Sequence, residues 1–183
     1  TTTVTYTATD GAGNTSTCSF TVTVTDAENP VLTVCPSNIT LNNDAGTCGA
    51  VATWTAPTAT DNCGTPTVTT SHASGSTFTL GTTTVTYTAT DGAGNTSTCS
   101  FTVTVTDTEN PSFNGNCISD TTLYTNATSC DVIVPDFTSS TQLNITDNCG
   151  TTGSGTITVT QTPVAGTTLG VGTHTVWIIA TDN

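Results

Sequence analysis

The stretch TTTVTYTATDGAGNTSTCSFTVTVTD, residues 82–107, decides the fold. Apolar and polar residues alternate along 84–90, where Val85, Tyr87 and Ala89 fall on one face and threonines on the other. The alternation returns along 98–106, and a period of two is typical of half-buried antiparallel strands. The segment DGAGN between them, residues 91–95, is rich in turn-forming residues. The stretch therefore predicts a β-hairpin.

The same 26 residues also stand at positions 1–26, an offset of 81 residues. Both copies run on into Glu-Asn-Pro, and a fixed period of this length predicts tandem copies of one small domain. A more divergent copy follows, since Asp-Asn-Cys-Gly occurs at 61–64 and again at 147–150. We divide the chain into the C-terminal part of a first repeat, 1–26, a complete repeat, 27–107, and a third repeat lacking its last strand, 108–183. The chain is interpreted as a window of a longer polymer.

Helical periodicity is nearly absent, so the remaining elements are also expected to be strands. Five further strands are predicted in the complete repeat, at 31–34, 39–41, 50–55, 67–71 and 77–80. Seven short strands in about 80 residues predict an immunoglobulin-like β-sandwich, with Trp54 anchoring the core. In the third repeat, Val176, Ile178 and Ala180 take the inward positions. The fold class is therefore all-β, with tandem immunoglobulin-like β-sandwich domains of about 80 residues.

The charge balance excludes several functions. The chain has no Lys or Arg against 13 Asp and Glu, a formal net charge of −13. Without cations to neutralise phosphates, we expect no nucleic-acid partner and no attraction to an anionic membrane surface. No apolar stretch is long enough to span a bilayer, so no membrane insertion is expected. Ordinary salt bridges between side chains are impossible within the chain, as are lysine isopeptide cross-links.

Cysteine supplies the expected covalent reinforcement. Eight cysteines in small domains indicate disulfides formed in an oxidising compartment, whereas the close CxxC pairs of zinc sites are missing. No catalytic activity is expected. His72 and His174 are the only histidines, one in each repeat, and no strained nucleophile motif accompanies them.

Several motifs resemble the hyalin-repeat (HYR) family of extracellular immunoglobulin-like modules. They are Cys35-Pro36 followed by Asn-Ile-Thr, Trp54 followed by Ala-Pro-Thr-Ala-Thr-Asp, and the Gly-Thr-Thr-Thr-Val-Thr-Tyr run from Gly81. The resemblance is weaker in the third repeat. The form with Asp-Asn-Cys-Gly and no basic residues resembles repeats of giant surface adhesins in gliding Bacteroidetes. Membership implies adhesion or extracellular scaffolding.

The resemblance also implies disulfides within each repeat. Cys35 would pair with Cys99, Cys48 with Cys63, and Cys130 with Cys149. Cys18 and Cys117 would then pair with cysteines outside this chain. The first pairing suits a sandwich whose first and last strands lie side by side. The second requires the segment 58–62 to fold back toward Cys48.

Carboxylates and amides are expected to gather at one pole of each sandwich, where the linker meets the loop between the last two strands. Such an oxygen-rich cluster suits Ca²⁺, whereas the alternative is that Asp and Asn serve only to form turns. The fold-back needed for Cys48–Cys63 would draw Asp61 away, so the two expectations compete there. The candidate ligands are Asp26, Glu28, Asn29, Asp61, Asp91 and Asn95, and then Asp107, Glu109, Asn110, Asp147 and Asp182.

Glycosylation is a further expectation. Asp120-Thr121-Thr122 resembles the O-glycosylation sequence of Bacteroidetes, which makes Thr121 the candidate site. Five Asn-x-Ser/Thr sequons are also present, but a chain this rich in Thr and Asn matches that pattern often by chance.

The sequence thus favours an extracellular, cell-surface stalk of a gliding or attachment adhesin, built as a filament. Its partners would be neighbouring repeats, other chains of a filament, and a surface or glycan ligand at a distant tip. Three alternatives remain open: an array of carbohydrate-binding modules, spacers attached to a secreted enzyme, and donor-strand assembly with a neighbouring chain.

Overall fold

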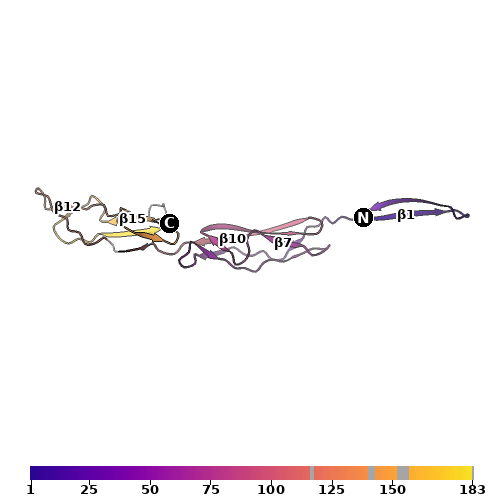
Figure 1. Ribbon diagram of the computed structural model, residues 1–183, viewed down its shortest axis with the longest axis horizontal. Helices are drawn as coiled ribbons and strands as arrows, with labels where there is room; N and C mark the ends of the chain where they lie inside the picture. The colour runs from indigo at the N-terminus through magenta and orange to yellow at the C-terminus, as the bar shows by residue number, and fades with distance from the viewer. Residues whose placement is uncertain (116–117, 140–142, 152–156, 183) are drawn as a thin grey trace. The chain divides into compact units, whose positions relative to one another are not determined.

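The computed structural model describes residues 1–115, 118–139, 143–151 and 157–182. Every regular element within these ranges is a β-strand, as the alternating sequence predicts (Figure 1). The first strands are β1 (Thr2–Thr9), β2 (Thr15–Val22), β3 (Val31–Leu32), β4 (Ile39–Asn42), β5 (Gly49–Val51), β6 (Ala59–Thr60), β7 (Thr67–Thr70), β8 (Thr77–Thr79), β9 (Gly81–Thr90) and β10 (Thr96–Thr106). They are followed by β11 (Ser112–Phe113), β12 (Asp131–Ile133), β13 (Ile145–Asp147), β14 (Gly150–Thr151), β15 (Ile157–Thr162), β16 (Thr168–Gly170) and β17 (Trp177–Asp182).

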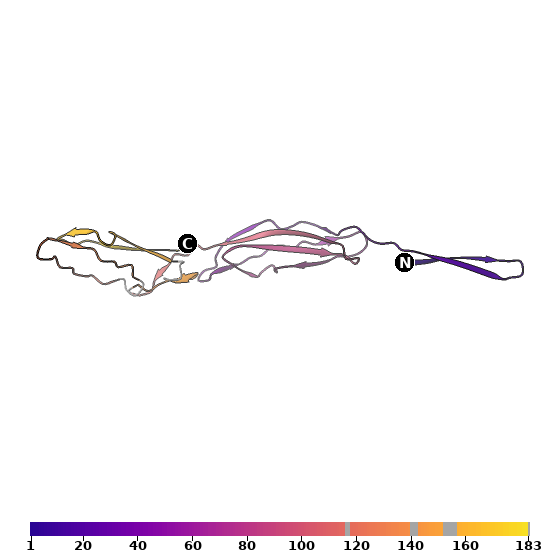
Figure 2. The ribbon, with the colours of Figure 1, turned by 90° about the horizontal axis from the view of Figure 1, so that it is seen from above.

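The largest sheet contains both strands of the stretch 82–107. Its order is β4-β10-β9-β7, with β4 parallel to β10 and β7 antiparallel to β9 (Figure 2). Alternate side chains of β9 and β10 are buried, as predicted: Val85, Tyr87 and Ala89 on one strand, and Phe101, Val103 and Val105 on the other. Two short pairs, β3-β6 and β5-β8, complete the strands of the complete repeat.

Two expectations for this repeat need correction. The strand expected at 50–55 ends at Val51, and β6 was not predicted. Trp54 therefore lies outside any strand and is only half-buried, with its ring edge-on to Phe101 at a centroid distance of 5.1 Å. Its indole Nε1–H donates to the Tyr87 hydroxyl at 2.6 Å, which satisfies the polar atom of an otherwise apolar contact.

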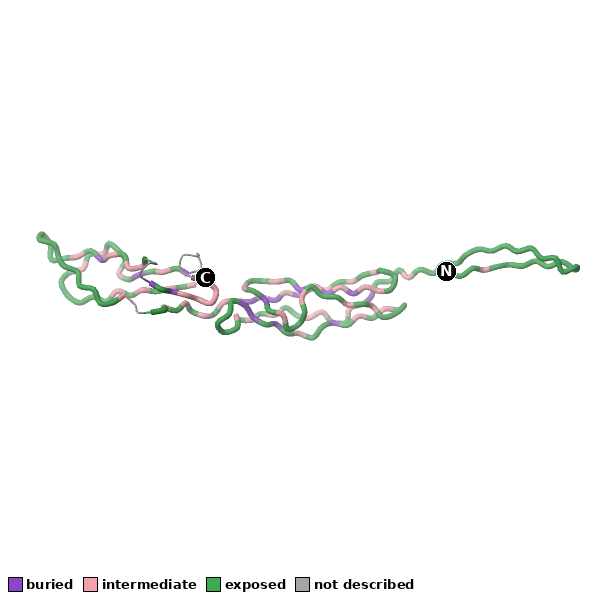
Figure 3. Tube along the Cα trace, viewed as in Figure 1, coloured by how far each residue is buried: buried purple, intermediate pink, exposed green. Residues whose placement is uncertain are grey.

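The N-terminal hairpin β1-β2 shows what the same sequence does without partner strands. Its register pairs Tyr6 with Cys18, and it forms a two-stranded sheet of its own. Tyr6 is 62 % exposed, whereas its sequence equivalent Tyr87 is 3 % exposed. Figure 3 shows the N-terminal hairpin almost entirely in the colour of exposed residues. Strand formation therefore follows the local alternation, while burial depends on the strands that cover the face.

Residues 108–182 form shorter sheets, in the orders β11-β13-β14, β12-β16 and β15-β17. Leu143, Ile145 and Ile157 form their buried cluster, against which Ile178 and Ala180 pack. The inward positions predicted for the third repeat are confirmed. Ile178 and Ala180 on β17 are partly buried with the exposed Ile179 between them, and Val176, just before the strand, is also partly buried.

Two compact units share the chain. One comprises residues 1–37, 54–73 and 84–101, and the other comprises 38–53, 74–83 and 102–183. Strands β9 and β10 have residues in both units. Each of the two disulfides lies within one unit.

Candidate functional site: disulfides and acidic clusters

The structure contains the expected Cys35–Cys99 disulfide. The two Cα atoms lie 5.9 Å apart, within the usual range for a disulfide, and the bond spans 64 residues of sequence. Cys99 lies on β10, and Cys35 lies in the segment that leads to β4, the parallel neighbour of β10. The bond therefore joins the beginning of the repeat to its last strand.

The other two expected pairings are wrong. Cys48 is bonded to Cys149, with Cα atoms 4.8 Å apart and 101 residues between them in sequence. Cys63 and Cys130, like Cys18, are exposed free thiols. Cys117 lies outside the described residues.

The Cys63 amide N–H donates to Asp61 Oδ1 at 2.9 Å in a turn of the unit that contains residues 54–73, whereas Cys48 and Cys149 both belong to the other unit. Cys149 occupies the same position in the second copy of Asp-Asn-Cys-Gly that Cys63 occupies in the first. The bond to Cys48 therefore links one predicted repeat to the next.

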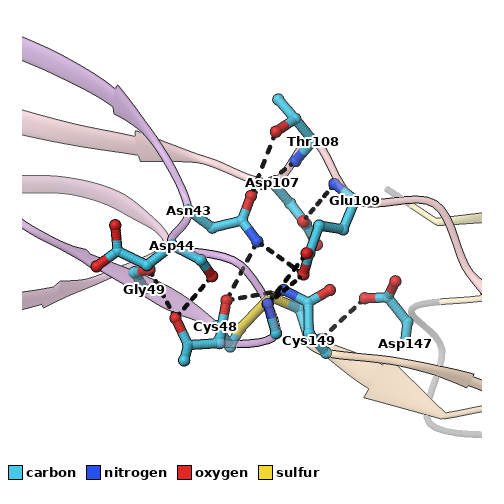
Figure 4. Close-up of a disulfide and its surroundings, with 12 residues drawn as sticks. Asn43, Asp44, Cys48, Gly49, Asp107, Thr108, Glu109, Asp147 and Cys149 are labelled. Atoms are coloured by element: carbon cyan, nitrogen blue, oxygen red, sulfur yellow. Dashed lines mark hydrogen bonds between the residues drawn. A yellow bond between two sulfur atoms is a disulfide. The ribbon is translucent and has the colours of Figure 1, made fainter.

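Hydrogen bonds also hold the loop 43–48 around the Cys48–Cys149 disulfide (Figure 4). The Glu109 carboxylate accepts the Gly46 amide N–H at 3.0 and 2.9 Å and the Asn43 Nδ2 at 3.4 Å. Asn43 Oδ1 in turn accepts the Thr108 amide N–H at 3.0 Å. Hydrogen bonds to an ionised carboxylate are about twice as strong as neutral ones. Glu109 is therefore the main polar anchor of the loop.

Asn148 supplies a second polar contact, donating from Nδ2 to the Thr47 carbonyl oxygen at 2.8 Å. An open groove runs past these groups, lined by Gly46, Glu109, Asn110, Ser112, Asn114, Thr146, Asp147 and Asn148. The sequence identified Glu109 and Asp147 as candidates but gave no sign of the contacts that Asn43, Thr47 and Asn148 make here. A search for Asx residues near both cysteines of each possible pair would have found Asn43 and Asn148.

Two acidic clusters recur at equivalent positions. One comprises Asp26, Asp61 and Cys63, whose ligand atoms lie within 4.8 Å of one another. Asp61 Oδ2 is buried and has no hydrogen-bond partner among the described residues. Burial and then the nearby negative charges of Asp26, Asp61 and Glu28, together with a hydrogen bond to Asp26, raise the pKa of the Cys63 thiol.

The second cluster comprises Asp107, Asp147 and Cys149, again within 4.8 Å of one another. The Cys149 sulfur is in a disulfide, so this cluster offers a cation its two carboxylates and no thiol. Asp107 Oδ1 accepts the Glu109 amide and Asp147 Oδ1 accepts the Cys149 amide, at 3.2 and 2.8 Å. Neither of these two hydrogen bonds uses the Oδ2 atom of its aspartate.

The other expected ligands fall into different roles. Asp91 Oδ1 accepts three amide N–H groups of its own hairpin loop, and Oδ2 accepts Asn95 Nδ2 at 2.8 Å. Burial acts to raise the pKa of Asp91, but the hydrogen bonds from Asn95, Gly94 and Ala93 outweigh it and lower that pKa. Asn95 Nδ2 also donates to the Asp26 carbonyl oxygen at 3.4 Å, so the loop does meet the linker. Asp91 therefore serves the turn.

The remaining candidate residues lie outside the two acidic clusters. Glu28 accepts Asn62 Nδ2 at 2.7 Å, and Asn29 and Asn110 are exposed. Asp182, at the end of β17, has a buried Oδ2 without a hydrogen-bond partner among the described residues. Thr121 is exposed, and His174 is exposed with Nε2 at 2.8 Å from the Gly170 carbonyl oxygen.

The acidic clusters fit a hard cation in their donor chemistry. Each places two carboxylates together, the chain has no Lys or Arg to compete for them, and the buried Asp61 Oδ2 has no hydrogen-bond partner among the described residues. Ca²⁺ takes six to eight oxygens, so backbone carbonyls and water would have to complete either site. Within the described ranges, no helix is long and apolar enough to cross a membrane.

The HYR domain family model matches residues 1–24 and 25–105. The chain belongs to the HYR domain family. The chain is similar to two proteins named hyalin. One, from Strongylocentrotus purpuratus, is 53% identical over 66 residues, and the other, from Lytechinus variegatus, is 52% identical over 67 residues. These matches cover 35% and 36% of the chain, but 6% and 13% of the hyalins, so the chain spans a small part of either relative. No solved structure matches the chain.

Proposed function

We propose that these HYR repeats form the extracellular stalk of a large cell-surface adhesin. The observation that carries the proposal is the Cys48–Cys149 disulfide, which joins one predicted repeat, 27–107, covalently to the next, 108–183. Glu109 and Asn148 reinforce that bond through hydrogen bonds to the same loop. Such a connection resists separation of repeats under load, which is what a stalk must do.

Composition supports the same role. Neighbouring repeats carry charge of one sign, so they repel one another and have no salt bridges with which to associate. Covalent bonds between repeats offset this repulsion without any opposite charge. Disulfides also agree with an oxidising environment outside the cytosol.

The wider setting rests on resemblance. HYR repeats that lack basic residues and carry Asp-Asn-Cys-Gly resemble those of giant adhesins in gliding Bacteroidetes, which favours a gliding or attachment filament. The partners in that setting are neighbouring repeats, other chains of the filament, and a surface or glycan ligand at a distant tip. Thr121 is the proposed attachment point for an O-linked glycan.

Antibodies raised against this chain test the proposal on cells that produce the parent protein. A surface stalk predicts labelling of intact cells and weaker attachment to a solid surface when monovalent antibody fragments are present. Labelling that requires permeabilised cells would refute the extracellular location. Normal attachment of fully labelled cells would refute the adhesive role.

We propose Ca²⁺ as the cofactor of the two acidic clusters, where Asp26 with Asp61 and Asp107 with Asp147 would provide carboxylate ligands. Bound calcium would neutralise repulsion between these acids and stabilise the fold. The expected result is a lower thermal midpoint in EDTA than in calcium. Asp61→Asn should shrink this difference, whereas Asp120→Asn, an exposed acid outside both clusters, should leave it unchanged. An identical midpoint in EDTA and calcium would reject calcium binding.

A second candidate function, glycan binding by the repeats themselves, is favoured by exposed aromatic side chains. Tyr124 is 85 % exposed and Trp177 is 66 % exposed, and exposed aromatic rings are the usual platforms for sugars. A glycan array with the full chain distinguishes the two functions. Binding that is lost in Trp177→Ala or Tyr124→Ala would support glycan recognition, and an array without signal would favour the stalk alone.

A further inference from the structure

The turn that carries Cys149 has a counterpart at Cys63. Residues 26–28 and 61–63 correspond in sequence to residues 107–109 and 147–149, with Asp, Glu, Asp, Asn and Cys in the same places. We name the first set the Cys63 face and the second the Cys149 face. Only the second is bonded to a loop in the described structure.

The two faces are built by the same contacts. The linker Asp accepts the amide of the Glu two residues later at 3.2 Å on both faces. The Asp of Asp-Asn-Cys accepts the cysteine amide at 2.9 Å on the Cys63 face and 2.8 Å on the Cys149 face. On each face the two aspartates and the cysteine place their ligand atoms within 4.8 Å. The Cys63 face is therefore preformed in the geometry that receives a loop.

The differences between the faces lie in the groups that touch the loop. On the Cys149 face, Glu109 binds the Gly46 amide and Asn148 binds the Thr47 carbonyl oxygen. On the Cys63 face, the equivalent pair bind each other, with Asn62 Nδ2 donating to Glu28 at 2.7 Å. Cys63 is an exposed thiol. The three groups that would hold a loop are thus present and have no loop to hold.

The sequence repeat indicates which loop would bind the Cys63 face. Residues 1–26 are identical with residues 82–107, which in the complete repeat follow the Asn-Asp-Ala-Gly-Thr-Cys loop 43–48. Hairpin β1-β2 thus corresponds to the last two strands of a repeat, and the other strands of that repeat would cover its exposed apolar face. Such a repeat, immediately before residue 27, would bring a 43–48-type loop to the Cys63 face.

We infer that Cys63 forms a disulfide with the Cys48-type cysteine of the preceding HYR repeat, so that one such bond joins every pair of successive repeats. The inference rests on the proposed stalk and names its internal partner. On docking, Glu28 exchanges Asn62 for the loop amide equivalent to Gly46, and Asn62 turns to the carbonyl oxygen equivalent to that of Thr47.

The bond forms by thiol–disulfide exchange with a small-molecule disulfide as the oxidant. The loop thiolate attacks that disulfide and releases one small thiolate, which gives a mixed disulfide. The Cys63 thiolate then attacks the loop sulfur and releases the second small thiolate. The two cysteines together lose two protons and two electrons, and the small disulfide is reduced to two thiols.

A chain extended at its N-terminus tests the inference. A copy of residues 27–81 placed before Thr1 completes the preceding repeat, because residues 1–26 match 82–107. In the added copy alone, Ala45→Ser marks the loop peptide by mass, and Cys63→Ser removes a second cysteine that would lie in a peptide identical to that of Cys63. After oxidation with glutathione disulfide, the chain is alkylated and digested with a protease that cleaves before aspartate. The expected result is a Cys63 peptide linked to the marked loop peptide and loss of Cys63 alkylation.

The matched control is the extended chain with Cys48→Ser in the added copy alone, in which Cys63 should be alkylated again. A disulfide between Cys18 and the Cys35 of the added copy, equivalent to Cys35–Cys99, would show independently of Cys63 that the added repeat has folded. Cys63 that is alkylated in the extended chain, or joined to the unmarked Cys48, would overturn the inference. Antibody labelling of intact cells would be unaffected by that result, so failure here leaves the extracellular stalk to its own test.

Discussion

The Cys48–Cys149 disulfide makes a quantitative prediction about how far the unfolded chain can be stretched. In the native chain, a pulling force applied at the two ends passes along 13 residues from Cys35 to Cys48 and crosses directly to Cys149. In Cys48→Ser/Cys149→Ser the force crosses from Cys35 to Cys99 and then follows 50 residues to position 149. The double variant therefore gains 37 residues (50 less 13), or about 130 Å at about 3.5 Å per residue.

Single-molecule pulling by the two termini without reductant measures this gain. Cys35→Ser/Cys99→Ser is the matched control, because its force path still crosses at Cys48 and its full extension should equal that of the native chain. Reduction of the native chain frees all 101 residues enclosed by the longer bond, or about 350 Å.

The outcome also distinguishes the bonding patterns. If Cys130 were bonded to Cys149 as the family resemblance implied, removal of Cys149 would free 19 residues, or about 65 Å. A gain near that smaller value, or an equal gain in the Cys35→Ser/Cys99→Ser control, would refute the reasoning.

Three further predictions follow from local contacts. Gly49→Ala should destabilise the fold by about 1–3 kcal/mol in denaturant titrations, because its Cβ would lie 2.6 Å from the Phe78 carbonyl oxygen, whereas Gly92→Ala, with open space around it, should change little. Asp91→Asn should reduce the loss of stability between about pH 6 and pH 2. The lowered pKa of Asp91 contributes stability at pH values above the ordinary pKa of an aspartate, about 3.9, and this contribution disappears as the pH falls through the lowered pKa. An unchanged dependence of stability on pH would contradict this. The raised pKa of Cys63 predicts that its alkylation reaches half-maximal rate at a higher pH than alkylation of a cysteine in an unstructured peptide. Replacing Asp26 and Asp61 by Asn should lower that pH. Identical dependence of the alkylation rate on pH in the two proteins would show that these acids do not act on the thiol.

The sequence predicted the strands well because their signal is local. Alternation along 84–90 and 98–106 requires no knowledge of partners, and β9 and β10 follow it. Burial is different. Phe20 is 49 % exposed and its equivalent Phe101 is 3 % exposed in identical sequence surroundings, so the local pattern cannot say which copy is covered.

The disulfides show a second limit. Cys63 and Cys149 occupy the same place in Asp-Asn-Cys-Gly, so spacing alone cannot say which of them meets Cys48. The deciding contacts are an Asn43 side chain and a Glu109 carboxylate more than sixty residues apart, which no short-range pattern connects. The acidic positions were easier to find, since acids beside a linker are visible in sequence. The hydrogen bonds of Asp91 to its own turn leave no sign in composition, so the sequence left open whether this residue serves as a ligand or as a turn residue.

The long bond also sets an order of maturation. In a chain that leaves the cell N-terminus first, Cys48 must wait until Cys149, 101 residues further along, has emerged and folded around its turn. In the proposed stalk, each repeat would therefore be completed by its successor. The most recently exported repeat would carry the unpaired Cys48-type thiol, and oxidants in the medium would act on that thiol.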